Sequence, residues 1–82
     1  MITGAQIRAA RTAVRFTIEE LAQRASVNAR TIMRYEQVDD VPGGRISTVM
    51  ALKRALEAAG IEFIGTPDDG PGIRLRRKPP GA

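Results

Sequence analysis

Apolar residues recur at helical spacing in four stretches of the chain. Residues three and four positions apart lie on one side of an α-helix, so this pattern predicts four amphipathic helices. The shared positions are Ile7, Ala10 and Val14; Ile18, Leu21, Ala22 and Ala25; Ile32 and Tyr35; and Val49, Leu52, Leu56 and Ala59. For a chain of 82 residues this indicates one small, mainly α domain.

Two of the predicted helices have a start signal that is complete within four residues. Thr3 is followed by Gln6 and Thr17 by Glu20, which is the spacing of a capping box. In this motif the hydroxyl accepts a hydrogen bond from a helical N–H, and the longer side chain bonds back to the N-cap N–H. We therefore expect the first two helices to begin just after these threonines.

Residues 17–36 contain two short helical patterns with a break between them. The first pattern stops around Ser26, and Asn28 is a favourable N-cap for the second. Two short helices joined by a turn of three or four residues form a helix-turn-helix, so we predict this motif over 17–36. The second helix spans 28–37, and its outer side carries Ala29, Arg30, Met33 and Arg34.

A loop separates this motif from the fourth helix. Pro42, Gly43 and Gly44 do not continue a helix, and they lie inside residues 37–45. We expect Ser47 to cap the fourth helix and Gly60 to follow its last turn.

The C-terminal segment changes from helical to strand-like patterning. Residues 62–64 and 73–76 are strand candidates, and the turn-rich residues 65–72 lie between them, so 62–77 predicts a β-hairpin. A lone two-stranded hairpin is marginal in water, and it must pack on the helices, pair with another chain, or do both. Our hypothesis is pairing with a second copy, through Phe63, Ile64, Ile73 and Leu75. Residues 78–82 are typical of a flexible tail.

The charge of the chain favours an anionic partner. Thirteen basic residues, eleven of them Arg, oppose nine acidic ones and give a net charge of +4. The planar guanidinium donates paired hydrogen bonds to phosphate and to guanine, which makes Arg the usual residue for nucleic-acid recognition. A solvated basic surface without a partner is the alternative interpretation.

Composition also excludes several kinds of chemistry. The chain has no Cys and no His, so it lacks disulfides, thiolate metal sites, the commonest metal ligand and the commonest general base. We therefore expect no cofactor, no metal site and no enzyme activity. No apolar run has membrane-spanning length and no secretory signal is visible, so we expect a cytoplasmic protein without membrane contact.

The helix-turn-helix stretch resembles a known family. Glu-Leu-Ala at 20–22, Thr-Ile at 31–32 and Tyr-Glu at 35–36 are similar to the motif of Cro/C1-type (XRE, lambda-repressor-like) DNA-binding proteins. The resemblance covers roughly residues 4–60. It implies a four-helix lambda-repressor-like DNA-binding domain over 1–61, followed here by a short hairpin, and a transcriptional regulator that acts as a repressor.

The same resemblance implies roles for individual residues. The second helix of the motif would lie in the major groove, where an Arg can bind guanine through both O6 and N7. The base-contacting candidates are Ala29, Arg30, Met33 and Arg34. The phosphate-contacting candidates are Thr17, Asn28, Thr31, Gly44 and Arg45. Alternatives remain for several of them: Asn28 as a helix cap, Thr31 bonded to its own helix, Met33 folded into the core, and Arg30 and Arg34 as solvated side chains without a partner.

The chain departs from the family pattern at two positions. Ser26 occupies the turn position that usually holds Gly, and a left-handed backbone there costs roughly 1 kcal/mol. Ile18 stands where a polar residue often contacts phosphate, so that contact is absent or comes from Thr17.

Two functions are compatible with these observations. In the first, a homodimer binds double-stranded DNA at two related half-sites, because one such module buries too little surface for tight specific binding. In the second, the chain is an antitoxin or anti-activator that holds a protein partner, with its C-terminal strand adding to the partner's sheet.

Overall fold

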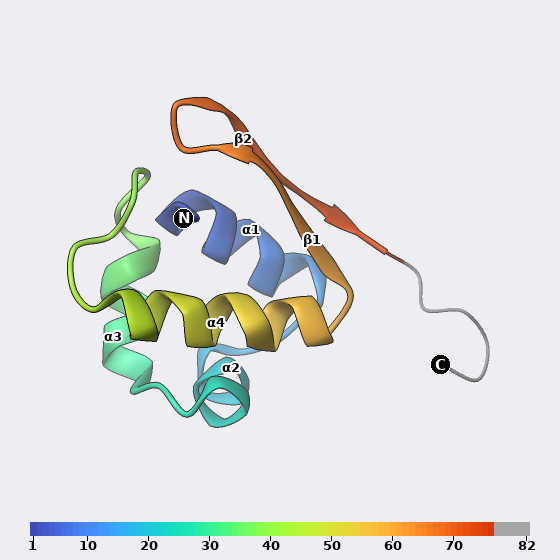
Figure 1. Cartoon of the computed structure of the whole chain (residues 1–82). Coiled ribbons are helices and arrows are strands. Elements are labelled where there is room, and N and C mark those ends of the chain that lie inside the picture. The colour runs from blue at the N-terminus through green and yellow to red at the C-terminus, as the bar shows by residue number, and fades with distance from the viewer. Residues whose placement is uncertain (77–82) are drawn as a thin grey trace.

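The computed structural model describes residues 1–76, which form four helices followed by an antiparallel two-stranded hairpin (Figure 1). The elements are α1 (Gly4–Ala13), α2 (Ile18–Ala25), α3 (Ala29–Glu36), α4 (Ile46–Ala58), β1 (Ile61–Thr66) and β2 (Asp69–Leu75). The predicted mainly α class with a C-terminal hairpin is confirmed. Arg77, at the end of the predicted hairpin, and the predicted tail 78–82 lie outside the described residues.

Both predicted capping boxes are present. The Thr3 hydroxyl accepts a hydrogen bond from the Gln6 N–H at 3.0 Å, and the Gln6 amide oxygen accepts one from the Thr3 N–H at 2.8 Å. Thr17 and Glu20 repeat this arrangement at 3.0 and 2.9 Å. These starts were predictable because all the atoms involved lie within one helical turn.

The predicted cap of the fourth helix is wrong. Helix α4 begins at Ile46, with Arg45 rather than Ser47 as its N-cap and no side-chain capping bond. The backbone explains the difference, because Arg45 is extended and its carbonyl already accepts hydrogen bonds from the N–H groups of Thr48 and Val49. The chain is therefore helical before it reaches Ser47.

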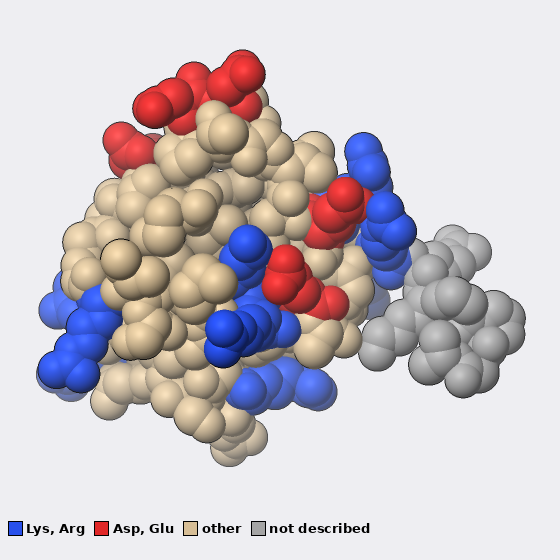
Figure 2. Space-filling model, viewed as in Figure 1, with Lys and Arg blue, Asp and Glu red and all other residues tan. Residues whose placement is uncertain are grey.

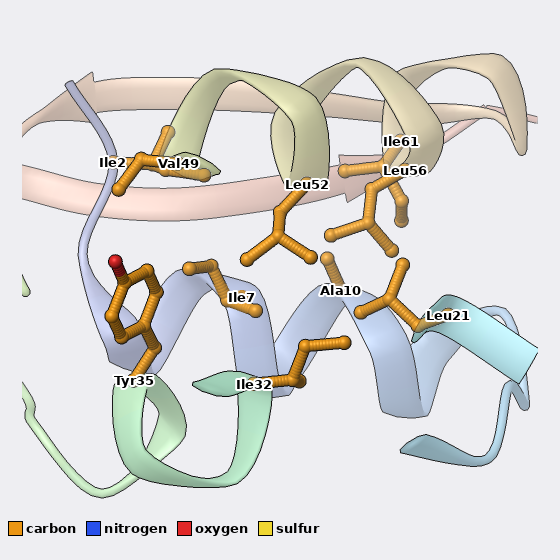
Figure 3. Packing of buried hydrophobic residues seen from close by; sticks show 10 residues of the cluster. All are labelled: Ile2, Ile7, Ala10, Leu21, Ile32, Tyr35, Val49, Leu52, Leu56 and Ile61. Carbon is orange, nitrogen blue, oxygen red and sulfur yellow. The ribbon is translucent and has the colours of Figure 1, made fainter. Parts of the chain in front are cut away.

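The four helices share one core. Leu21, Ile32 and Leu52 are fully buried and converge with Ile7 between α4 and α1 (Figure 3). The complete buried apolar set is Ile2, Ile7, Ala10, Leu21, Ile32, Tyr35, Val49, Leu52, Leu56 and Ile61. Because each helix contributes to it, α2 and α3 are fixed relative to the rest of the fold.

The hairpin packs on its own helices. Phe63 lies opposite Ile73 in the strand register, and both are half-buried against the core. The buried Gln6 side chain joins α1 to both strands, since its amide nitrogen donates to the carbonyl oxygens of Ile64 at 3.1 Å and Gly72 at 2.8 Å. Intramolecular packing thus supports the hairpin, while Leu75 remains 52% exposed.

The strands are longer than predicted. The expected strands 62–64 and 73–76 extend into the stretch 65–72, so most residues of the predicted turn belong to a strand. The register shifts between Ile64 and Thr66, and Gly65 and Gly70 both have positive φ. A Cβ atom at Gly65 would lie 2.1 Å from the Gly70 carbonyl oxygen. Gly65 therefore allows the two strands to approach closely at this irregularity, and the strands continue past it.

Candidate nucleic-acid interface

The predicted helix-turn-helix is present as α2, a three-residue turn and α3. Ser26 adopts the left-handed conformation, with φ 55° and ψ 43°, and so takes the strained backbone that the family pattern gives to Gly. Asn28 caps α3, because its side-chain oxygen accepts a hydrogen bond from the Arg30 N–H at 2.8 Å. The cap role expected for Asn28 is confirmed, and a phosphate contact by its amide stays a prediction.

Helix α3 has one buried side and one exposed side. Ile32 and Tyr35 are buried, whereas Arg30, Met33 and Arg34 are exposed, with 49% of Met33 accessible. Ala29 and Thr31 are half-buried at its first turn. Met33 is therefore outside the core, and the base-contacting candidates lie together along the solvent side of one helix.

The charged groups of this exposed side have no ionic partner within residues 1–76. The ion pairs of that region involve Arg8, Arg11, Arg74 and Arg76, and none includes Arg30, Arg34 or Arg45. A guanidinium with no carboxylate beside it keeps its full capacity to bind an external anion or a base edge. Two guanidinium groups one helical turn apart are thus available at α3.

The C-terminal end of α3 is bound to α1 by a largely buried ion pair. Arg11 binds the Glu36 carboxylate with two hydrogen bonds of 2.7 and 3.0 Å and donates a third to the Phe16 carbonyl at 2.9 Å. The Glu36 side chain is 7% exposed and the Arg11 side chain 20%. Hydrogen bonding to Glu36 raises the pKa of Arg11, so this cation is permanently charged. Arg8 donates to the Glu36 backbone carbonyl and pairs with Asp39 at 3.3 Å.

Sequence reasoning missed this ion pair. The sequence predicts no particular partner for Arg11, and the carboxylate that it binds lies 25 positions away. A signal was present, because Glu36 follows Ile32 by four positions and therefore lies on the apolar side of α3. A carboxylate at such a position requires a partner.

Gly4 was also missed. A Cβ atom there would lie 1.9 Å from the Val38 carbonyl oxygen and 2.1 Å from that of Tyr35. The Gly4 N–H donates to the Asp40 carbonyl at 3.0 Å. The start of α1 therefore lies directly against the end of α3, and it fixes that end together with the ion pair.

The loop before α4 brings Arg45 to the surface beside α3. Gly44 has a φ of 119°, and a Cβ atom on it would lie 2.5 Å from the Tyr35 hydroxyl oxygen. The backbone conformation and the contact with Tyr35 therefore require a glycine at position 44. At position 43 they do not, because a Cβ there would have no neighbour within 4 Å. The close approach of these glycines to DNA stays a prediction. Arg45 is exposed at the uncapped start of α4.

Thr17 is a less favourable phosphate candidate than Arg45. Its hydroxyl accepts the Glu20 N–H, and Glu19 and Glu20 follow it at the start of α2. Hydrogen bonds from the Thr17 backbone and side chain lower the pKa of Glu20, which keeps this carboxylate charged at neutral pH. A phosphate near Thr17 would therefore meet like charge.

Charge is unevenly distributed over the molecule. Figure 2 shows acidic side chains at the end where the hairpin turn and the loop after α3 lie, whereas basic side chains lie near α3 and the start of α4, over the middle of α4 and at the far end of the hairpin. The acidic end contains Asp39, Asp40, Asp68 and Asp69. This polarity gives an approaching polyanion a preferred direction.

Three further arginines have partners within the described residues. Arg24 lies over the Phe16 ring, 4.4 Å from its centroid. Arg76 and Arg74 pair with Glu62 at 2.8 and 3.2 Å, and hydrogen bonding, first from Arg76, lowers the pKa of this carboxyl group. A second basic patch on the hairpin is therefore partly neutralised.

Comparison with protein-family models finds no match, and comparison with curated protein sequences finds none either. Across residues 1–76, no helix combines the length and the apolar character that a membrane span requires.

Proposed function

We propose that this protein is a sequence-specific DNA-binding regulator with a lambda-repressor-like domain, and that α3 lies in the major groove. The observation that carries the proposal is the exposed side of α3, where Arg30 and Arg34 have no ionic partner among residues 1–76. The other side of the same helix is held by the core. A rigid helix with free guanidinium groups suits base recognition.

The dimensions of α3 suit this role. An α-helix with its side chains is about 10–12 Å in diameter, and the major groove, about 12 Å wide, admits it. Arg30 and Arg34 are separated by about 6 Å along the axis, which corresponds to roughly two base-pair steps. We infer that they bind guanines at nearby base pairs. Ala29 and Met33 are suited to contact thymine methyl groups.

Backbone contacts would fix the position of α3 in the groove. Arg45, with the adjacent Gly44, and Asn28 and Thr31 at the start of α3 are the phosphate-contacting candidates that suit this orientation. The acidic hairpin turn would face away from the DNA. Because one module buries only about 600–1,000 Å², we expect an operator with two related half-sites about one helical turn apart. A protein bound there would act as a repressor by occupying the site.

Selection of bound duplexes from random DNA, at a fixed salt concentration, tests the proposal. The expected result is an enriched motif with two related half-sites. The matched control is the double variant Arg30→Ala/Arg34→Ala, which should fold normally and enrich no motif because both side chains are exposed. If the folded wild-type protein enriches no motif, the proposal fails, and a protein-binding module such as an antitoxin becomes the better interpretation.

A further inference from the structure

Met33 exposes a thioether on the side of α3 that the core does not cover. The residue is 49% exposed, although methionine is apolar and commonly fills gaps inside a core. It belongs neither to the buried core nor to the half-buried residues packed against that core. In a helix a long side chain leans back over the preceding turn, so Met33 extends over Ala29 and Arg30. Ala29 has only a methyl group, so it covers little of the sulfur.

Methionine is the residue type of this chain that a peroxide oxidises most readily. The chain has no Cys and no Trp, and its single tyrosine, Tyr35, is buried. The other two methionines are Met1 and Met50, and Met50 is half-buried on α4. Peroxide converts an accessible thioether into methionine sulfoxide, which replaces an apolar side chain by a polar one. Met33 is the methionine of α3, the helix that carries the base-contacting candidates.

Arg30 lies one helical turn before Met33. It takes part in no ion pair of residues 1–76, so its N–H donors are available. Residues three positions apart in a helix have Cβ atoms about 5–6 Å apart, which a guanidinium can span. The sulfur of a thioether is a weak hydrogen-bond acceptor, whereas the oxygen of a sulfoxide is strongly polar. Oxidation of Met33 would therefore give Arg30 an acceptor within its own helix.

We propose that Met33 is a site of reversible oxidation by hydroperoxides and that its oxidation weakens DNA binding. In the reaction the sulfur attacks one peroxide oxygen and gives it an electron pair. The O–O bond breaks, an S–O bond forms, and the other oxygen takes up the proton and leaves as water, or as an alcohol from an alkyl hydroperoxide. The sulfur is oxidised and the peroxide is reduced. A dithiol and a methionine sulfoxide reductase reverse the change, since the thiols become a disulfide and the oxygen leaves as water.

The effect on binding rests on the proposed DNA-binding function and has two causes. The sulfoxide places a polar group where an apolar side chain would contact a thymine methyl group. The same oxygen competes with a guanine for the donors of Arg30. Stability should change little, because Met33 lies outside the core. Oxidation would therefore lower affinity in a protein that stays folded.

Peroxide treatment of the purified protein tests the proposal, with peptide mass spectrometry and titration of the selected duplex as readouts. Met33 should take up oxygen faster than Met50, and the oxidised wild type should bind about tenfold more weakly with unchanged circular dichroism. The two epimer-specific methionine sulfoxide reductases, supplied with a dithiol, should restore the affinity. Complete oxidation of Met33 with unchanged affinity would overturn the proposal, and so would oxidation no faster than that of Met50.

Substitutions assign the effect to position 33. Met33→Leu keeps Met1 and Met50, so its own affinity should be the same before and after peroxide. Met33→Gln places a neutral hydrogen-bond acceptor at this position without any oxidant and should bind like the oxidised wild type. If Met33→Leu loses as much affinity on peroxide treatment as the wild type, another methionine is responsible and the proposal fails.

An NMR measurement without DNA separates this proposal from the DNA-binding proposal. Oxidation should shift the Nε–H signal of Arg30 and slow its exchange with water. The signal of Arg34 should change less, because adjacent residues of a helix do not face each other. A wild type that enriches no DNA motif but shows selective oxidation of Met33 and the Arg30 shift contradicts the DNA-binding proposal and retains the oxidation site. An enriched motif with an affinity that oxidation leaves unchanged contradicts the role of Met33 alone.

Discussion

Two pairs of arginines, one on α1 and one on α3, are chemically alike but differ in their surroundings. Arg8 and Arg11 bind the end of α3 through the carboxylate and backbone carbonyl of Glu36. Arg30 and Arg34 are exposed and take part in no ion pair of residues 1–76. Net charge counts these four residues equally. The hydrogen bonds and ion pairs of each side chain distinguish the arginines that stabilise the fold from those that remain available for a ligand.

The two pairs are connected through α3 itself. The α1 pair and the close contact at Gly4 hold the C-terminal end of α3, and the core holds its inner side. The outer side therefore presents its guanidinium groups from a fixed backbone. Mutations in the first pair should reduce stability, and mutations in the second should reduce only binding.

The largest effect is expected at the buried ion pair. Glu36→Ala leaves the guanidinium of Arg11 mostly buried and without its carboxylate, and it should lower the free energy of unfolding by about 3 kcal/mol. Urea denaturation followed by circular dichroism measures this loss. Arg34→Ala is the matched control and should stay within about 0.5 kcal/mol of the wild type. Equal stability of the two variants would remove the distinction between the arginine pairs.

The second effect concerns DNA affinity. Arg34→Ala should weaken binding to the selected duplex by ~1–3 kcal/mol and relax the preference at one base position, because a bidentate base contact is lost. Titration of the selected duplex and of a random duplex measures it. Equal losses on both duplexes would show that Arg34 does not contact a base.

Two neighbouring glycines offer a similar contrast in the loop before α4. Gly44→Ala should cost about 2 kcal/mol of folding stability, because φ is 119° and the Tyr35 hydroxyl oxygen lies 2.5 Å from the new Cβ. Gly43→Ala should be nearly neutral, since nothing lies within 4 Å of its Cβ position. Thermal unfolding of the two variants measures the difference. Similar midpoints would mean that Gly44 is not held against Tyr35.

Arg45→Ala should have a smaller and less specific effect. A phosphate contact does not depend on sequence, so its loss should weaken binding to every duplex by a similar factor. The slope of log affinity against log salt should decrease by about one unit. A slope equal to that of the wild type would place Arg45 away from the DNA backbone.

The smallest effect is expected at Glu62, an exposed carboxylate on the hairpin. Hydrogen bonding to Arg76 and Arg74 lowers its pKa below the ordinary 4.5, so its stabilising contribution is present above pH 4.5 and is lost as pH falls through the lowered value. Between about pH 6 and about pH 3 the wild type should lose slightly more thermal stability than Glu62→Gln. Identical pH profiles would show that these ion pairs contribute nothing in solution.

The sequence predicts those parts of the fold whose atoms are close along the chain. The capping boxes at Thr3 and Thr17 and the cap at Asn28 could be predicted because each depends on a few consecutive residues. The left-handed turn at Ser26 was indicated only by the family resemblance. The hairpin strands were predicted too short, because Gly65 permits a close approach of the two strands, and the sequence alone does not distinguish such a glycine from one in a turn.

The candidate site also contains features that local sequence predicts and features that it does not. The exposed positions of α3 follow from helical periodicity, so Arg30 and Arg34 were predictable from spacing, whereas the sequence left Met33 open between the surface and the core. The partner of Arg11 and the close contact at Gly4 depend on elements that meet only after folding. For the same reason the sequence could not divide the arginines into structural and available groups.

Amide chemical-shift mapping with the selected duplex is the most direct test of the claim that α3 binds DNA. The account predicts that the largest changes occur in residues 29–34 and 44–47, while residues 67–70 at the hairpin turn remain nearly unchanged. The largest changes in the hairpin turn, with α3 unaffected, would contradict it.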